Sequence, residues 1–251
     1  MQATMPDIPL PEEIGIELEK RCKDLGIKYI LPSLSTFCVG LNAPVVPVSV
    51  KRVARQGWGI HGFGDYGYGG EEAECYGVPD PKTLIQLPWK QDFGWLACDL
   101  YYKSKVSPRC PRTTLKNQIQ QLRDLGFVLK TGFEPEIFIL DKEEIKPRTS
   151  QDRPGNRYFD PGMELAHADF ITKLLDCLDQ LGWGPYQIEK EASLAQYEIN
   201  FGYTDALSSA DRMLFFKFMV KVRAKTFYKY PCITDKNLMA LLLVSVGVAK
   251  G

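Results

Sequence analysis

Apolar residues recur at helical spacing in three segments of this chain, and each segment then stops at a Leu-Gly pair. A glycine at this place supplies the left-handed residue that commonly ends a helix. An extended run follows, at 27–31, at 127–140 and across 191–198. The pattern predicts three amphipathic helices that each lead into strands. Their apolar stripes are Ile14, Leu18, Cys22 and Leu25; Leu115, Ile119, Leu122 and Leu125; and Phe170, Leu174, Leu178 and Leu181.

A fourth helix is predicted over 205–225, with Leu207, Ala210, Leu214 and Phe218 on one face. Between residues 32 and 107 proline, glycine and aromatic residues dominate, with short strand-like runs. Two prolines then precede a new helix, which predicts a domain boundary near residue 107. We therefore expect an α+β chain with domains at 1–106 and 107–251, the latter ending in a divergent tail at 227–251.

The overall composition excludes several classes of protein. Lys plus Arg equals Asp plus Glu at 31 each, so no net charge favours nucleic acid or an anionic membrane. Seven scattered cysteines without a CxxC pair indicate reduced thiols in a cytoplasmic protein. The apolar run 238–249 is shorter than the roughly 20 residues that span a bilayer. It is expected to be a buried strand or helix, or a non-native tail.

Two short glutamate clusters carry the candidate chemistry. Glu134 and Glu136 are two apart, so on a strand they share a face. Pro135 between them indicates an edge or a bulge. Glu191 and Glu198 form the second cluster. Carboxylate oxygens are the ligands that Mg²⁺ and Mn²⁺ prefer, and such ions can bridge to nucleotide phosphates. The alternative is that these glutamates lie on the solvated face of half-buried strands.

The second cluster has its own geometric requirement. Gln196, Glu198 and Asn200 share one strand face, and the intervening aromatic and apolar residues share the other. Glu191 precedes Glu198 by seven residues, so a straight strand would place it on the opposite face. Residues 192–195 must turn or bulge if the two carboxylates are to converge. Lys190, between Glu189 and Glu191, has the pattern of an exposed charge group.

The amino-acid sequences of these segments, and their order along the chain, resemble those of the glutamine synthetase family, most closely the branch with type III glutamine synthetases and glutamate–methylamine ligases. The resemblance rests on residues 132–138 (GFEPEIF), 191–201 (EASLAQYEINF) and 203–217 (YTDALSSADRMLFFK). Upstream, 78–89 (VPDPKTLIQLPW) and 95–100 (WLACDL) resemble the end of that family's N-terminal domain. The resemblance covers about residues 24–225.

This resemblance implies a β-grasp-like N-terminal domain and part of a catalytic domain with an antiparallel sheet and helices. It implies ATP-dependent ligation of ammonia, or a small amine, to the γ-carboxylate of glutamate through γ-glutamyl phosphate. Glu136, Glu191 and Glu198 match ligands of a first Mg²⁺ or Mn²⁺, and Glu134 matches a ligand of a second. No side chain is assigned to catalysis or to nucleotide binding. A homo-oligomeric ring is implied, with no nucleic acid or membrane partner.

The chain also departs from the family pattern. Lys190 stands where the family usually has a histidine, and Ala195 where it has a glycine, which would strain the turn if a positive φ is required. Neither His61 nor His167 matches a family histidine; His167 is expected to be structural. After residue 227 the family's Gly-Ser-Gly-Met-His-type segment is not recognisable. The alternative expectation is therefore a catalytically incomplete remnant, or a regulatory or interaction subunit of a ring.

Overall fold

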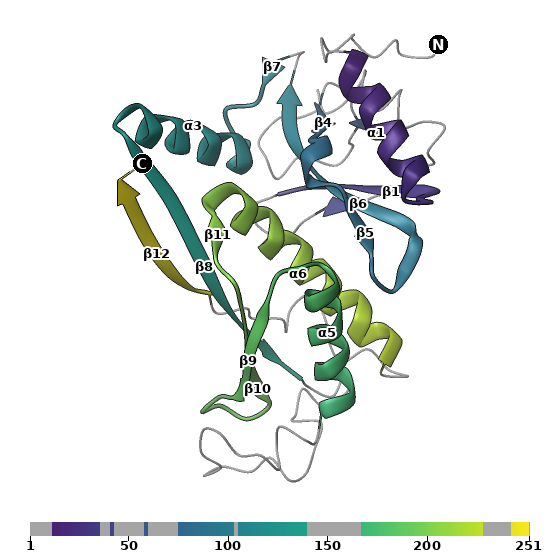
Figure 1. Cartoon of the computed structure of the whole chain (residues 1–251), viewed down its shortest axis with the longest axis vertical. Coiled ribbons are helices and arrows are strands. Elements are labelled where there is room, and N and C mark those ends of the chain that lie inside the picture. Colours follow the sequence, from purple (N-terminus) through teal and green to yellow (C-terminus); the bar gives the residue numbers. More distant parts are fainter. Residues whose placement is uncertain are drawn as a thin grey trace. The chain divides into compact units, whose positions relative to one another are not determined.

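The computed structural model describes residues 12–35, 41–42, 58–59, 75–102, 105–139, 167–227 and 242–250. The chain divides into two compact units, residues 1–126 and 127–251. Figure 1 shows their helices and strands. Each unit combines a sheet with helices, so the predicted α+β class is confirmed. The domain boundary near residue 107 stays a prediction.

The first unit is built on one mixed sheet. Its elements are α1 (Glu12–Asp24), β1 (Tyr29–Leu34), β2 (Leu41–Asn42), β3 (Trp58–Gly59), β4 (Cys75–Pro79), the 3₁₀ helix η4 (Pro81–Thr83), β5 (Ile85–Leu87), β6 (Lys90–Tyr102), β7 (Lys105–Val106) and α3 (Pro111–Asp124). The strand order is β2-β1-β6-β4-β3, and β5 and β7 also pair with β6. Only β1 and β6 run parallel among these described strands. The β-grasp-like arrangement stays a prediction, because most of 36–74 lies outside the described residues.

The core of the first unit confirms part of the predicted stripe on α1. Leu18 and Cys22 are buried against apolar residues of β1 and β6. Gly26 has a φ of +69°, as expected for the residue that ends the helix. Leu25, immediately before it, is 43% exposed, because a residue at the helix end projects past the packed face. The side chain of Ile14 lies outside the described part.

An ionic cluster fastens α3 to the sheet. The buried Arg112 guanidinium donates to Asp99 Oδ1 at 3.1 Å and to Asp80 Oδ2 at 2.8 Å. Lys116 Nζ lies 2.5 Å from Asp99 Oδ2. Burial raises the pKa of Asp80, but its hydrogen bond to Arg112 and the charges of Arg112 and Lys116 outweigh this effect. The pKa of Asp80 is consequently below its ordinary value.

The second unit is an antiparallel sheet with two helices beside it. Its elements are β8 (Phe127–Phe138), α5 (Ala168–Gln180), β9 (Pro185–Lys190), β10 (Gln196–Phe201), β11 (Thr204–Asp205), α6 (Ala206–Phe227) and β12 (Leu242–Lys250). The strand order is β11-β8-β10-β9, and β12 pairs with β8 from Phe127 to Pro135. Within the apolar run 238–249, the strand interpretation is confirmed from residue 242 onward. Figure 1 shows β8 as the long central strand of this unit.

The predicted apolar stripe is buried on α5 but not on α6. On α5, Phe170, Leu174 and Leu178 are buried as predicted. On α6 the predicted face is wrong, because its four residues are only half-buried. The buried positions begin one residue earlier and include Ala206, Ser209, Met213, Phe216 and Val220. Apolar residues surround much of α6, so spacing alone does not select one face.

Aromatic packing joins these helices to β10. Phe201 contacts Trp183 and Phe216, with ring centroids 5.6 and 5.7 Å apart respectively. His167 is the N-cap residue of α5, and its ring meets Tyr197 edge-on at 5.6 Å. The expected structural position of His167 is consistent with this packing. Within the described residues, no helix combines the length and apolarity needed to cross a bilayer.

Candidate metal centre

Two of the four predicted ligands lie directly opposite each other on neighbouring strands. Glu136 of β8 is the register partner of Glu198 of β10. Both residues are buried, at 4% and 8% exposure respectively. Side chains of directly opposed residues share a face, and their Cβ atoms are roughly 5 Å apart in such pairs. The pairing therefore brings carboxylates from both sequence clusters to one place.

Amides on β10 hold these two carboxylates. Gln196 Nε2 donates to Glu136 Oε2. Asn200 Nδ2 donates to Glu198 Oε1 at 2.8 Å. The three polar residues of β10 thus share one face, as their spacing predicted. The remaining oxygen of the Asn200 amide, Oδ1, is buried and has no hydrogen-bond partner among the described residues.

Glu134 and Glu191 lie at the edges of this pair. Glu134 is half-buried on β8 and is the register partner of Leu243 on β12. Pairing of β8 with β10 begins at Glu136, one residue after Pro135, so the missing N–H of this proline lies outside that ladder. Glu191 is half-buried in the turn between β9 and β10.

The turn between β9 and β10 has the reversal that the sequence required. The N–H of Glu191 donates to the carbonyl of Gln196 at 2.9 Å, and the N–H of Gln196 donates to the carbonyl of Ser193 at 3.3 Å. Ala195 has a φ of +59°, the single positive value among described residues other than glycine. The strain expected at this position is therefore present.

Replacing Ala195 with valine is expected to destabilise the protein by about 3 kcal/mol. A β-branched side chain is strained at positive φ, and Ala195 is buried, so two extra methyl groups would have to displace packed neighbours. Urea unfolding measures the change. The matched control is Ala192→Val in the same turn, where the side chain is exposed and the expected change is within about 0.5 kcal/mol. Equal losses in both variants would contradict the assigned strain.

The electrostatics of the site are those of carboxylates held together. Burial raises the pKa of Glu198, and the negative charges of Glu134, Glu191 and Glu189 raise it further. The hydrogen bond from Asn200 opposes these effects without cancelling them. Glu134 and Glu191, two of the other three predicted ligands, therefore contribute to this field, and Glu136 lies directly opposite Glu198 on the neighbouring strand. Among the described residues, no three His, Cys, Asp or Glu side chains lie close enough to hold a metal ion as they stand.

The donor chemistry of this site fits a hard divalent cation. Every candidate ligand is an oxygen, and oxygen ligands are typical of Mg²⁺ and Mn²⁺ sites. The buried and unpartnered Oδ1 of Asn200 is a further acceptor next to Glu198. A bound cation would offset the repulsion that raises the pKa of Glu198. Assignment of the four glutamates as ligands stays a prediction.

The interpretation of Lys190 as an exposed charge group is wrong. Its relative exposure is 0%, and its register partner is the buried Tyr197. Lys190 Nζ donates to the carbonyl oxygens of Glu191 and Ser193, each at 2.6 Å. The neighbouring glutamates suggested that Lys190 is exposed to solvent, but it lies on the core face of the sheet. Only the register of β9 against β10 reveals that face.

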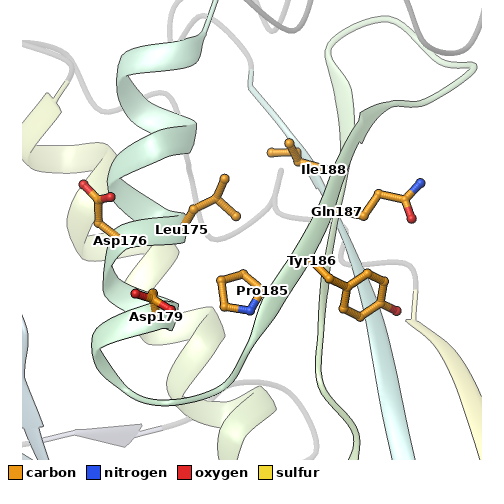
Figure 2. A pocket seen from close by; sticks show the side chains of 7 residues that line it. All are labelled: Leu175, Asp176, Asp179, Pro185, Tyr186, Gln187 and Ile188. Carbon is orange, nitrogen blue, oxygen red and sulfur yellow. The ribbon is translucent and has the colours of Figure 1, made fainter.

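A separate hollow of about 420 Å³ lies between α5 and β9. Figure 2 shows Leu175 of α5 and Ile188 of β9 among the residues that line it. None of the four predicted ligands does so. Its two carboxylates, Asp176 and Asp179, are exposed, and Lys173 lies 3.7 Å from Asp176. These features are typical of a solvated helix surface, so the hollow is not our candidate site.

Comparison with known proteins decides the family. The sequence profile of "Glutamine synthetase, catalytic domain" matches residues 108–240, more than half of the chain. The chain belongs to the glutamine synthetase family. It is 32% identical over 208 residues to a glutamine synthetase of Rhizobium meliloti, covering 82% of this chain and 48% of that protein. It is 33% identical over 210 residues to a glutamate–methylamine ligase of Methyloversatilis universalis, covering 80% and 47% respectively.

Solved glutamine synthetase-like structures share the fold. A structure of GmaS with ADP superimposes with a TM-score of 0.80 and 30% identity, covering 91% of this chain and 50% of that one. Plasmodium falciparum glutamine synthetase gives a TM-score of 0.74 at 17% identity, covering 94% and 54%. The chain thus spans about half the length of the glutamine synthetase relatives it matches. The resemblance inferred from the glutamate-containing segments is confirmed at the level of the family.

Proposed function

We propose that this protein takes part in ATP-dependent ligation of ammonia, or a small amine, to the γ-carboxylate of glutamate through γ-glutamyl phosphate. Family membership supports the reaction class. The observation that carries the proposal is the buried, directly opposed pair of Glu136 and Glu198, each held by an amide from β10. A carboxylate pair fixed inside a sheet is suited to binding a cation at a constant position.

The four glutamates are proposed to divide between two ions, Mg²⁺ or Mn²⁺. Glu136, Glu191 and Glu198 would hold the first ion, and Glu134 would contribute to the second. Such ions neutralise charge on transferring phosphoryl groups and orient them. The protein's own contribution is to fix the carboxylates: Gln196 and Asn200 hold two of them from β10, and the turn at 191–195 presents Glu191.

The organisation of the protein is proposed on the same basis. The catalytic domain begins near residue 107, supported by a family match that starts at residue 108. Residues 1–106 form the N-terminal domain, and residues 227–251 are a divergent tail. A homo-oligomeric ring in the cytoplasm is proposed by analogy with the family alone.

A product assay tests the proposed reaction. The purified protein is incubated with ATP, glutamate, Mg²⁺ and either ammonia or methylamine, and the γ-glutamyl product is quantified by mass spectrometry. We expect an ATP-dependent product that falls at least 100-fold in Glu136→Gln. Because the two amines differ by one methyl group, discrimination of about 10–200-fold in kcat/KM identifies the preferred one. If metal-saturated protein forms neither product, the proposed catalytic activity is contradicted. The alternative, a catalytically incomplete remnant or a regulatory or interaction subunit of a ring, is then favoured.

A further inference from the structure

Lys190 occupies a position that a charged side chain rarely takes. It is the last residue of β9 and is completely shielded from solvent. Its partners in the sheet are the buried Tyr197 on β10 and, beyond it, Ile137 on β8. Lysines are almost never fully buried unless their ammonium group is paired, since burying an unpaired charge is costly. The contacts of the Lys190 ammonium group must therefore offset the cost of its burial.

The ammonium group of Lys190 bonds the turn that follows it. It donates to the carbonyl oxygens of Glu191 and Ser193, both at 2.6 Å. These carbonyls belong to the segment that reverses the chain between β9 and β10. Hydrogen bonds from a charged donor are shorter and stronger than neutral ones. Lys190 thus ties together two points of the turn with one charged group.

The same turn carries Glu191 and is otherwise strained. The left-handed backbone of Ala195 is unfavourable for a residue with a side chain. The Glu191 carboxylate accepts a hydrogen bond from the N–H of Ala192 at 3.2 Å, so it lies against its own turn. Any change in the course of residues 191–193 would move this carboxylate. Its position relative to Glu198 therefore depends on what holds the turn.

We propose that Lys190 is a positioning residue that fixes the turn at 191–195 and thereby orients the Glu191 carboxylate for a divalent cation. Lys190 does not itself contact the cation, because its side chain starts on the Tyr197 face of the sheet while Glu136 and Glu198 share the other face. The inference rests on the proposed function, in which Glu191 is a ligand. The inference extends the metal centre to a residue on the opposite, core face of the sheet, which acts through the turn.

A double-mutant cycle tests this role. Mn²⁺ binding is measured by electron paramagnetic resonance in wild type, Lys190→Met, Glu191→Gln and the double variant. Loss of an outer positioning partner typically weakens metal binding about 10–100-fold, which we expect for Lys190→Met. Because Lys190 acts through Glu191, the double variant should bind Mn²⁺ no more weakly than Glu191→Gln alone. If the affinity losses of the two single variants multiply in the double variant, the proposal is overturned.

Unfolding measurements separate positioning from stability. Lys190→Met is expected to lower the urea midpoint as well, because two partly buried carbonyls lose their charged donor. A lower midpoint with unchanged Mn²⁺ affinity would show a structural role alone and overturn the inference. Lys190→Gln keeps an N–H donor, but on a shorter and neutral side chain, so it should lose affinity relative to wild type, though less than Lys190→Met. If the methionine variant does not fold, the comparison of Lys190→Gln with wild type decides, and unchanged affinity overturns the proposal.

Matched variants distinguish failure of this inference from failure of the proposed function. Lys173→Met, on the exposed surface of α5, should leave Mn²⁺ affinity unchanged. If Glu136→Gln and Glu198→Gln weaken Mn²⁺ binding but Lys190→Met does not, only the role of Lys190 is wrong. If wild type binds no Mn²⁺, or the two glutamate variants bind it as well as wild type, both proposals are wrong.

Discussion

Replacing Glu198 with glutamine is expected to abolish the stabilisation that Mn²⁺ gives, without destabilising the metal-free protein. Ligand at 100 times its dissociation constant stabilises a native state by about 2.7 kcal/mol, or roughly 5–10 °C for a chain of this size. Glutamine retains an oxygen that accepts the hydrogen bond from Asn200 but lacks the negative charge. The metal-free variant should therefore unfold at the same temperature as wild type or higher.

The opposite signs of these two effects make the Glu198 experiment specific. Burial and three neighbouring glutamates disfavour the charged form of Glu198, so removing the charge relieves an unfavourable interaction. A metal ligand is lost at the same time. Differential scanning calorimetry with and without Mn²⁺ measures both. Asp179→Asn, an exposed acid on α5, is the control and should keep the full Mn²⁺-dependent shift. Equal Mn²⁺-dependent shifts in Glu198→Gln and wild type would contradict the ligand assignment.

Replacing Arg112 with methionine is expected to cost about 3 kcal/mol of unfolding free energy at pH 7. Removing one partner of a buried ion pair leaves an uncompensated charge, which typically costs 3–5 kcal/mol. The side chain of Arg112 is 3% exposed and contacts both Asp80 and Asp99. Lys116 remains beside Asp99, which places the expected loss at the lower end of this range. Urea unfolding measures it.

The loss in Arg112→Met should depend on pH. The pKa of Asp80 is lower in the folded than in the unfolded chain, so its contribution is complete above about pH 5 and lost as the pH falls through the acidic range. The difference between wild type and variant should therefore shrink below pH 5. Arg123→Met, exposed on the same helix, should change stability by no more than about 0.5 kcal/mol at either pH. A loss that is constant with pH would contradict the role of this ion pair.

The sequence identified the helix ends and the strand faces because these depend on local chemistry. Gly26, Gly126 and Gly182 all have the left-handed φ that a helix-ending glycine supplies. The shared face of Gln196, Glu198 and Asn200 followed from the two-residue period of a strand. Neither inference requires knowing which elements pack together. The structure therefore confirms both.

Features that depend on pairing could not be read in this way. The register that places Glu136 opposite Glu198 is set by strands that are distant in sequence. Lys190 was misread for the same reason, since its burial follows from its position opposite Tyr197. The buried face of α6 depends on its neighbours, because apolar residues occur around much of that helix. Leu125 completes an apolar stripe on α3 yet is 71% exposed at the helix C-cap.

Titration of Mn²⁺ into the purified protein, followed by electron paramagnetic resonance, tests the central claim that the two glutamate clusters together form a divalent-cation centre. The account predicts saturable loss of the free Mn²⁺ signal, competition by Mg²⁺, and no saturable binding over the same concentration range when Glu136, Glu191 and Glu198 are all replaced by glutamine. Failure of wild type to bind Mn²⁺, or equal binding by wild type and the triple variant, would contradict it.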